Sequence, residues 1–389
     1  MARRREVYNS EPFGAPRRRQ SQGSFAGTLL NSILLVVTIL LVVALVIAYL
    51  TPHVSPSSFG SLTIVGIFAP ILYIGVVLCL LVWIIMARWK TAGVVALFLI
   101  PGLFHLSDFY SIAYMRQVEQ KPSSSSFTLM SYNVRGFRND SSYMTIDRHV
   151  EYFENQDLPD VVCFQEYALD IPNVERIDSL FNARQKTLYK KDVVESGEVV
   201  LRTYSRFPII GSGSGSLSGE GRGTSQWVDV VVGKRDTLRI FNNHLHTMSI
   251  SSADSADIEE GTILNDSDRM QSIVERIAKN SSIRVEHVDT LRSIVDCSPY
   301  RNVICGDFND TPMSYVYNEL IEGYHDAFEQ CGSGYGYTFR PMHGMLRIDY
   351  ILLSKGLQAE TYMADKTNEL SDHLPIMARI KMLPKAGKK

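Results

Sequence analysis

The residues best suited to chemistry follow a short apolar run, Val303–Cys305, which predicts a buried strand that ends at Gly306. Asp307 and Asn309 come next, within the stretch 303–312. Because residues two apart on an extended chain point the same way, this carboxylate and carboxamide can address one small volume at the rim of a sheet. The pair suits a phosphate ester, since Asp accepts a proton or orients water while Asn donates to a charged oxygen. A turn followed by a helix cap would explain the same residues without any chemistry.

Polar side chains also stand in or at the ends of other predicted strands. The further candidates are Asn133, Glu166, His244, Asp349, Asp372 and His373. Each alone has an ordinary structural explanation, such as a turn, a surface acid or a buried imidazole. Their order along the chain is more informative: Tyr-Asn-Val, Gln-Glu, Asn-x-His-Leu, Gly-Asp-Phe-Asn, Arg-Ile-Asp-Tyr-Ile and Ser-Asp-His-Leu-Pro.

The segments that must position these residues are mostly strand-like. Apolar runs predict strands at 127–134, 161–164, 198–204, 226–232, 237–245, 303–305, 337–339, 347–353 and 376–382. Helical spacing predicts helices at 146–153, 269–278, 283–295 and 314–321, with a break at 280–282. The Gly/Ser-rich stretch 211–223 and the polar stretch 249–267 are predicted as loops. Many strands with few helices between them favour two sheets packed face to face with helices outside, rather than a doubly wound parallel sheet.

The ordered motifs resemble the endonuclease/exonuclease/phosphatase superfamily, which includes pancreatic deoxyribonuclease, abasic-site endonucleases, neutral sphingomyelinases and inositol polyphosphate 5-phosphatases. The resemblance covers about Phe127 to Ile380, and Gly-Asp-Phe-Asn followed by Ser-Asp-His-Leu-Pro is its most specific part. The segment Tyr204–Ile209 also looks like the family's strand-to-turn segment. The resemblance implies an α+β, DNase I-like four-layered sandwich of two packed mixed sheets flanked by helices.

The same resemblance implies a metal-dependent site. Glu166 would be the first ligand of Mg²⁺, or of Mn²⁺ in its place, with Asn133 beside it and Asp372 near. Mg²⁺ prefers oxygen ligands and keeps several waters, so few carboxylates suffice. His373 would meet the substrate phosphate and the attacking water, oriented by Asp349. Imidazole suits proton transfer near neutrality.

Three further roles follow from the resemblance. Asp307 would orient or deprotonate the water nucleophile, and Asn309 would hold a phosphoryl oxygen. His244 would contact the phosphate or assist the leaving group. The sequence leaves open whether Asp307 or His373 is the general base.

The first third of the chain predicts a membrane region. Apolar segments at about 29–50 and 62–87 each reach the ~20 residues that cross a bilayer, and a weaker segment lies at about 91–110. We therefore predict a basic cytoplasmic tail (1–28), a transmembrane region (29–115) of two or three helices, a linker (116–126) and a catalytic domain (127–383). Lys and Arg in the tail and at Arg88 and Lys90 place those parts inside the cell, so a spanning third segment leaves the catalytic domain outside the cytoplasm.

Charge is also unevenly divided. Before Arg116 the chain has eight Lys or Arg and three Asp or Glu, and the remainder has 31 basic and 38 acidic residues, a formal charge of minus seven. An acidic domain argues against a non-specific grip on nucleic acid, where Lys and Arg contacts to phosphate dominate affinity. We therefore expect a multi-pass protein of the cell (inner) membrane that hydrolyses phosphate esters with Mg²⁺, preferring a lipid or small phosphodiester.

Two other functions remain open at this stage. One is a nuclease acting on DNA or RNA. The other is an inactive protein that binds phosphate or helps a membrane assembly. The expected partners are the phosphate-ester substrate and the lipid bilayer, and the sequence identifies no protein partner.

Overall fold

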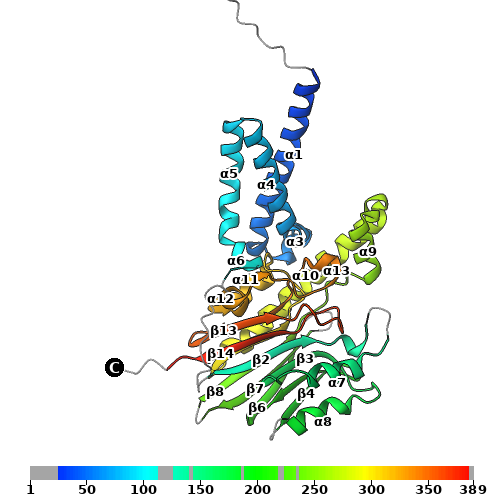
Figure 1. Ribbon diagram of the computed structural model, residues 1–389, viewed down its shortest axis with the longest axis vertical. Coiled ribbons are helices and arrows are strands. Elements are labelled where there is room, and N and C mark those ends of the chain that lie inside the picture. The colour runs from blue at the N-terminus through cyan, green and yellow to red at the C-terminus, as the bar shows by residue number, and fades with distance from the viewer. Residues whose placement is uncertain are drawn as a thin grey trace, which may run out of the picture.

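The computed structural model of the chain describes residues 25–112, 126–139, 143–184, 188–217, 223–233 and 236–384. Most of the predicted tail (1–28) and nearly all of the predicted linker (116–126) lie outside the described residues. Figure 1 shows a bundle of apolar helices standing on one end of a larger body of two sheets with helices around them.

Two six-stranded sheets form the larger body. The first has the order β10 (Tyr324–Asp326), β12 (Asp349–Ser354), β9 (Arg301–Asp307), β8 (Asp236–His244), β7 (Thr224–Val232) and β6 (Ile209–Ser216). The second has the order β13 (Leu357–Ala364), β14 (Ile376–Met382), β2 (Ser126–Asn133), β3 (Val161–Ala168), β5 (Val199–Ser205) and β4 (Tyr189–Ser196). Both sheets are mixed, since β8 pairs with β9 and β2 with β3 in parallel while the other neighbours are antiparallel.

Apolar side chains fill the space between the sheets and the space under the outer helices. The central cluster draws on both sheets, for example Leu129 and Cys163 of one and Ile240 and Val303 of the other. Helices α7 (Ile146–Glu154) and α8 (Glu175–Arg184) cover the outer face of the second sheet, and α10 (Ser267–Asp296) and α11 (Tyr315–Ile321) cover the first. This four-layered arrangement confirms the predicted fold class.

Four local predictions were wrong. Residues 211–216 of the Gly/Ser-rich stretch predicted as a loop belong to edge strand β6 and pair with β7, while 218–222 lie outside the described residues. The stretch 249–267 holds helix α9 (Ser252–Glu260) and a 3-10 turn, η4 (Thr262–Asn265). Helix α10 runs unbroken through 280–282, where Ser282 bonds the Ala278 carbonyl within the helix. The segment 337–339 is not a strand and makes only isolated bridges at Phe339.

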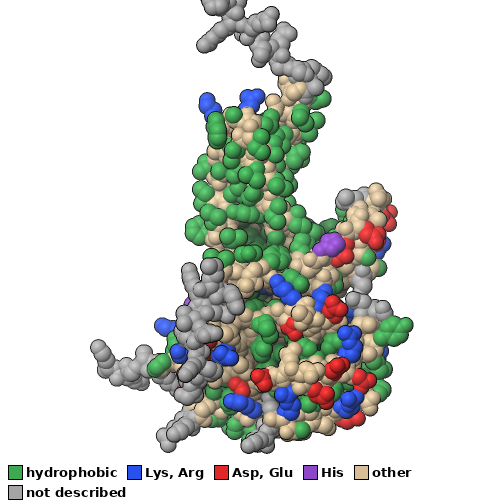
Figure 2. Space-filling model, viewed as in Figure 1, with side chains coloured by type: hydrophobic (Ala, Val, Ile, Leu, Met, Phe, Trp, Pro, Cys, Tyr) green, Lys and Arg blue, Asp and Glu red, His purple; other side chains and the backbone are tan. Residues whose placement is uncertain are grey.

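The N-terminal third forms the helix bundle. Its elements are α1 (Phe25–Leu50), η1 (Thr51–His53), α2 (Pro56–Phe59), α3 (Leu62–Ile67), α4 (Ala69–Ile85), α5 (Trp89–Phe104), α6 (Leu106–Phe109) and β1 (Tyr110–Ser111), the last paired with β11 (Gly334–Tyr335). One described helix, Gly27–His53, is long and apolar enough to cross a membrane, and the two shorter apolar helices α4 and α5 pack beside it. The predicted span 62–87 is therefore two helices, α3 and α4. Figure 2 shows apolar side chains over the visible face of the bundle, with Lys and Arg at the end far from the sheets.

The bundle packs directly on the sheet domain. The Thr51 hydroxyl lies 2.7 Å from the Met313 carbonyl, and the Ser282 hydroxyl donates to the Pro56 carbonyl at 3.0 Å. Gly66 passes so close that a Cβ there would come within 2.3 Å of the Met313 carbonyl oxygen. Met313 follows the loop that begins at Asp307, so the bundle contacts the chain a few residues from the candidate site.

Candidate active site

Strand register brings the sequence candidates to one edge. His244 pairs with Asp307 across the parallel β8 and β9, and Asp349 pairs with Asp307 across the antiparallel β9 and β12. The second sheet contributes Asn133 at the end of β2 and Glu166 near the end of β3, where a bulge interrupts the pairing with β5. The ends of two sheets therefore converge on a single polar centre.

The glycine before Asp307 is required by the close approach of β8. Gly306 has φ +133°, and a Cβ on it would lie 1.9 Å from the Asn243 carbonyl oxygen. Only glycine accepts this backbone and this contact without displacement of β8. Gly306 thus fixes the strand end from which Asp307 projects.

Asn133 joins the two sheets at the centre of the site. Its buried Nδ2 donates to Glu166 Oε1 at 3.0 Å and to Asp307 Oδ2 at 3.1 Å. The Glu166 side chain is 37% exposed, whereas that of Asp307 is 1% exposed. Burial, more than any other effect, raises the pKa of Asp307 to about 6, with His373 opposing it. Glu166 is consequently the carboxylate most open to an incoming ion.

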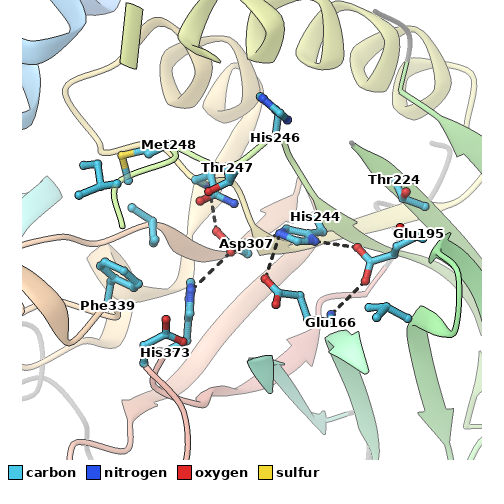
Figure 3. A pocket seen from close by; sticks show the side chains of 16 residues that line it. Glu166, Glu195, Thr224, His244, His246, Thr247, Met248, Asp307, Phe339 and His373 are labelled. Carbon is cyan, nitrogen blue, oxygen red and sulfur yellow. Dashed lines mark hydrogen bonds and ion pairs between the residues drawn. The ribbon is translucent and has the colours of Figure 1, made fainter. Parts of the chain in front are cut away.

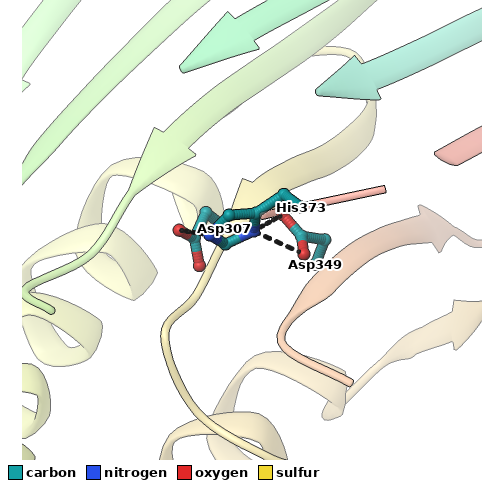
Figure 4. Close-up of side chains that lie close together, drawn as sticks. All are labelled: Asp307, Asp349 and His373. Carbon is teal, nitrogen blue, oxygen red and sulfur yellow. Dashed lines mark hydrogen bonds and ion pairs between the residues drawn. The ribbon is translucent and has the colours of Figure 1, made fainter. Parts of the chain in front are cut away.

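His373 and Asp349 form a close couple (Figure 4). Nδ1 of His373 lies 3.0 and 3.2 Å from the two Asp349 oxygens, and its Nε2 lies 3.7 Å from Asp307 Oδ2. Burial opposes the charged imidazole, but Asp349 and Asp307 raise the pKa of His373 well above its ordinary value. Asp307, Asp349 and His373 also offer ligand atoms within 4.8 Å of one another. Because Asp349 uses both oxygens on His373, a His-carboxylate couple describes these three better than a metal site.

His244 has a partner that the sequence did not reveal. Glu195, whose side chain is 7% exposed, lies 2.7 Å from His244 Nδ1 through Oε1, and its Oε2 accepts from the Glu166 backbone N–H. His244 Nε2 faces Glu166 and Asp307 at 3.6 and 3.7 Å. Burial alone would lower the pKa of His244, but the carboxylates of Glu195, Glu166 and Asp307 together outweigh it and raise the pKa to about 10. Glu195 is a polar residue near the end of strand β4, the same kind of position as the other candidates, but the sequence did not predict that strand.

Asn309 and Asp372 lie at the site in less direct positions. The Asn309 backbone N–H donates to Asp307 Oδ1 at 2.8 Å, while its side-chain Nδ2 donates to the Leu245 carbonyl. Asp372 lines the same pocket, but its Oδ2 lies 3.4 Å from Nε of Arg135. All eight predicted residues thus lie in or beside one centre, and Asp372 faces a cation of the protein itself.

Six of the eight predicted residues, all except Asn133 and Asp349, line a pocket of about 680 Å³ (Figure 3). Glu166, Glu195, His244, Asp307 and His373 form its polar floor. The rest of the lining includes the apolar side chains Met248, Ile250, Phe339 and Ile348.

A family model described as the Endonuclease/Exonuclease/phosphatase family matches residues 130–373. The chain belongs to the endonuclease/exonuclease/phosphatase family. By family it is a hydrolase of phosphoester bonds. A second model, a domain of unknown function (DUF8431), matches residues 31–109. No curated protein matches the chain.

Solved structures resemble the chain at low identity. An endonuclease/exonuclease/phosphatase from Beutenbergia cavernae is 18% identical with a TM-score of 0.49, over 67% of this chain and 72% of that one. The human nocturnin catalytic domain with bound sulfate is 15% identical (TM-score 0.47), over 66% and 94%. A mannosyl-6-phosphatase from Bacteroides thetaiotaomicron is 17% identical (TM-score 0.46), over 65% and 99%. Family membership rests on the family model rather than on these neighbours.

The charges of this endonuclease/exonuclease/phosphatase site fit a divalent cation. Carboxylates outnumber cations at the centre, where Glu166, Glu195, Asp307 and Asp349 meet the two imidazoles of His244 and His373. An additional positive charge would offset their repulsion. The open donors are oxygens, which hard cations such as Mg²⁺ prefer. The donor set therefore suits Mg²⁺ or Mn²⁺ rather than a thiolate-bound metal.

Proposed function

We propose that the chain is a membrane-anchored, Mg²⁺-dependent phosphoesterase, with Mn²⁺ as a substitute ion, that acts on a lipid or small phosphodiester. The observation that carries the proposal is the meeting of Glu166, Asp307 and the His373–Asp349 couple at one pocket edge. A phosphodiester is anionic and resists attack by water, so a site must offset charge and remove a proton together. These residues supply both.

Glu166 would hold the ion, with Asn133 keeping Glu166 and Asp307 in place and Asp372 near the opposite side. The bound Mg²⁺ would supply charge neutralisation at the phosphoryl oxygens. Every other step belongs to the protein's own residues. Because Asn133 already donates to both carboxylates, its substitution should loosen the whole centre.

We assign different proton roles to Asp307 and His373. Asp349 and Asp307 face the two ring nitrogens of His373 and, against the opposing effect of burial, raise its pKa well above the ordinary value, so we take the imidazole as charged with a proton on each nitrogen. His373 is then a charged donor to a phosphoryl oxygen, with Asn309 as a second donor. Asp307 takes the proton from water as the water oxygen bonds to phosphorus.

His244 completes the balance of protons. It too lies between carboxylates, Glu195 at Nδ1 and Glu166 with Asp307 at Nε2. As the ester P–O bond breaks, the Nε2 proton passes to the departing oxygen, and an alcohol leaves. Glu195 holds the imidazole in place for this transfer.

The helix bundle supports a position at the cell membrane with the catalytic domain outside the cytoplasm. Helices α1, α4 and α5 stand side by side, and the α4–α5 connection that carries Arg88 and Lys90 lies at the end far from the sheets. By the positive-inside rule that end is cytoplasmic. If all three helices span the membrane, the site lies outside the cytoplasm. The tail (1–28) would then be cytoplasmic, the helices (29–115) would lie in the membrane, and the catalytic domain (127–383) would be extracytoplasmic.

The test uses the full chain in nanodiscs, offered phospholipids, bis(p-nitrophenyl) phosphate, DNA and RNA in parallel. Each substrate is assayed with Mg²⁺, with Mn²⁺ and with chelator, and His373→Ala is the control. We expect Mg²⁺-dependent turnover of the lipid or the small diester, abolished by His373→Ala. Cleavage of nucleic acid alone would make the protein a nuclease, and binding without turnover would make it an inactive phosphate-binding protein.

A further inference from the structure

A second cavity lies where the helix bundle meets the sheet domain, and we name it the junction recess. Its volume is about 610 Å³, within the ~300–1,000 Å³ typical of ligand pockets. One wall belongs to the start of α4, and the other belongs to α9 and to the loop that carries α13 (Pro341–Gly344). The lining is predominantly apolar and includes Phe68, Ile71, Ile74, Ile258, Met342 and Met345.

The recess continues the outer surface of the bundle. Ile71 and Ile74 line it and are 51% and 59% exposed. They belong to the same apolar helix α4 whose outer face carries Leu78 and Leu81, also exposed. Figure 2 shows this apolar surface reaching down to the sheet domain. With the bundle in a bilayer, hydrocarbon chains would surround this apolar surface, and they are the ligand that such a surface fits.

Two chain segments connect the junction recess with the catalytic pocket. In the first, Met248 and Ile250 line the catalytic pocket and Ile258 lines the recess. In the second, Phe339 lines the catalytic pocket and Met345 lines the recess. The five side chains belong to one hydrophobic cluster, so apolar contacts run from the lining of one cavity to the lining of the other. A ligand whose apolar part follows the surface of this cluster could contact both cavities.

We propose that the junction recess holds an acyl chain of a lipid phosphoester whose phosphate lies in the catalytic pocket. This inference rests on the proposed function and names its substrate class as a membrane lipid. The phosphate would meet His373 and Asn309, and the chain would pass over Phe339 towards Ile71. The substrate would then enter sideways from the leaflet nearest the catalytic domain.

The experiment fills the recess and compares two substrates. Ile71→Trp adds bulk inside the recess, whereas Ile100→Trp adds the same bulk at a residue of α5 that is 49% exposed and lies outside the recess lining. Full-length proteins in nanodiscs are assayed on a dioleoyl phospholipid that the wild type hydrolyses and on bis(p-nitrophenyl) phosphate. We expect Ile71→Trp to lower kcat/KM for the lipid at least ~10-fold, with the soluble diester unchanged. Ile100→Trp should change neither.

A second readout keeps the proposal testable apart from catalysis. A phosphatidylglycerol with a photoreactive acyl chain is crosslinked to the wild type in nanodiscs, and labelled peptides are identified by mass spectrometry. We expect label on 68–74 or 342–345, and less of it in Ile74→Trp, which fills the recess independently. Equal lipid turnover by Ile71→Trp and Ile100→Trp would overturn the proposal, even with label in the recess. Failure of the wild type to hydrolyse any phosphoester would refute the proposed function, whereas recess label would still report lipid binding.

Discussion

The edge of the sheets that carries the candidate site and the junction between the helix bundle and the sheet domain are both closely packed. They differ in the groups that meet there. At the catalytic edge, four carboxylates and two imidazoles meet through side chains, and each residue type is set by its charge and donors. At the junction, Gly66 and Thr51 meet the backbone of Met313, so size and closeness matter more than charge. Substitution at the edge should therefore remove chemistry and spare the fold, whereas substitution at the junction should weaken packing first.

The largest effect is expected at the catalytic edge. His373→Ala or Asp307→Asn should lower kcat about 10²–10⁴-fold, the usual contribution of a positioned acid or base. The measurement is steady-state hydrolysis of whichever substrate the wild type turns over, with the thermal melt recorded beside it. His325→Ala, an exposed histidine on β10, is the matched control and should retain activity. Loss of the melting transition in His373→Ala would mean that His373 is needed for folding rather than for catalysis.

The next effect separates ion binding from proton transfer. Glu166→Gln should raise the Mg²⁺ concentration for half-maximal activity about 10–100-fold, because the amide loses the charge that attracts the cation. Titration calorimetry with Mg²⁺ gives an independent value. Glu151→Gln, an exposed acid on α7, serves as the control. An unchanged titration for Glu166→Gln would remove this residue from the ligand set.

At the junction the expected effect is on stability. Gly66→Ala places a Cβ 2.3 Å from the Met313 carbonyl oxygen, so the backbone must shift, at a cost of about 1–3 kcal/mol. Gly93→Ala on α5 meets no atom within 4 Å and should leave the thermal melt unchanged. The measurement is the unfolding midpoint in nanodiscs, with activity beside it. If Gly66→Ala melts like Gly93→Ala, the bundle and the sheet domain do not pack as described.

The smallest effect concerns one hydrogen bond. Thr51→Val keeps the side-chain shape but loses the hydroxyl that lies 2.7 Å from the Met313 carbonyl, a loss of about 1 kcal/mol. Because Met313 follows the loop of Asp307 and Asn309, we also expect a modest fall in kcat with an unchanged KM. An equal result for the Thr51→Val and wild-type proteins would show that the junction does not reach the catalytic loop.

The sequence predicted the centre of the site better than its surroundings. Asn133 and Asp307 stood out because short apolar strands end in polar residues, whereas His373 was proposed from the ordered motifs that resemble the family. Glu195 was missed because its importance depends on His244, 49 positions away in the chain. Local composition could not indicate that pairing.

Element boundaries failed where tertiary contacts overrode local preference. The small residues of β6 looked like a loop, yet they pair with strand β7. The polar residues at 280–282 looked like a helix break, yet Asn280 faces His246 and Ser282 also bonds the Pro56 carbonyl. Each of these partners lies in another part of the fold. The prediction that the N-terminal segments span the membrane several times stays a prediction.

The contacts of Thr51 and Ser282 hold the sheet domain against the bundle, and so they fix the distance between the catalytic pocket and the end of the bundle. With the bundle in a bilayer, the pocket would stay at a constant distance from the membrane, and its encounters with a lipid substrate would be two-dimensional. The rate of hydrolysis would then depend on the mole fraction of substrate in the membrane. Dilution of the substrate with inert lipid would lower this rate, whereas dilution of the sample with buffer would not. A phosphoester on a facing vesicle would stay beyond its reach.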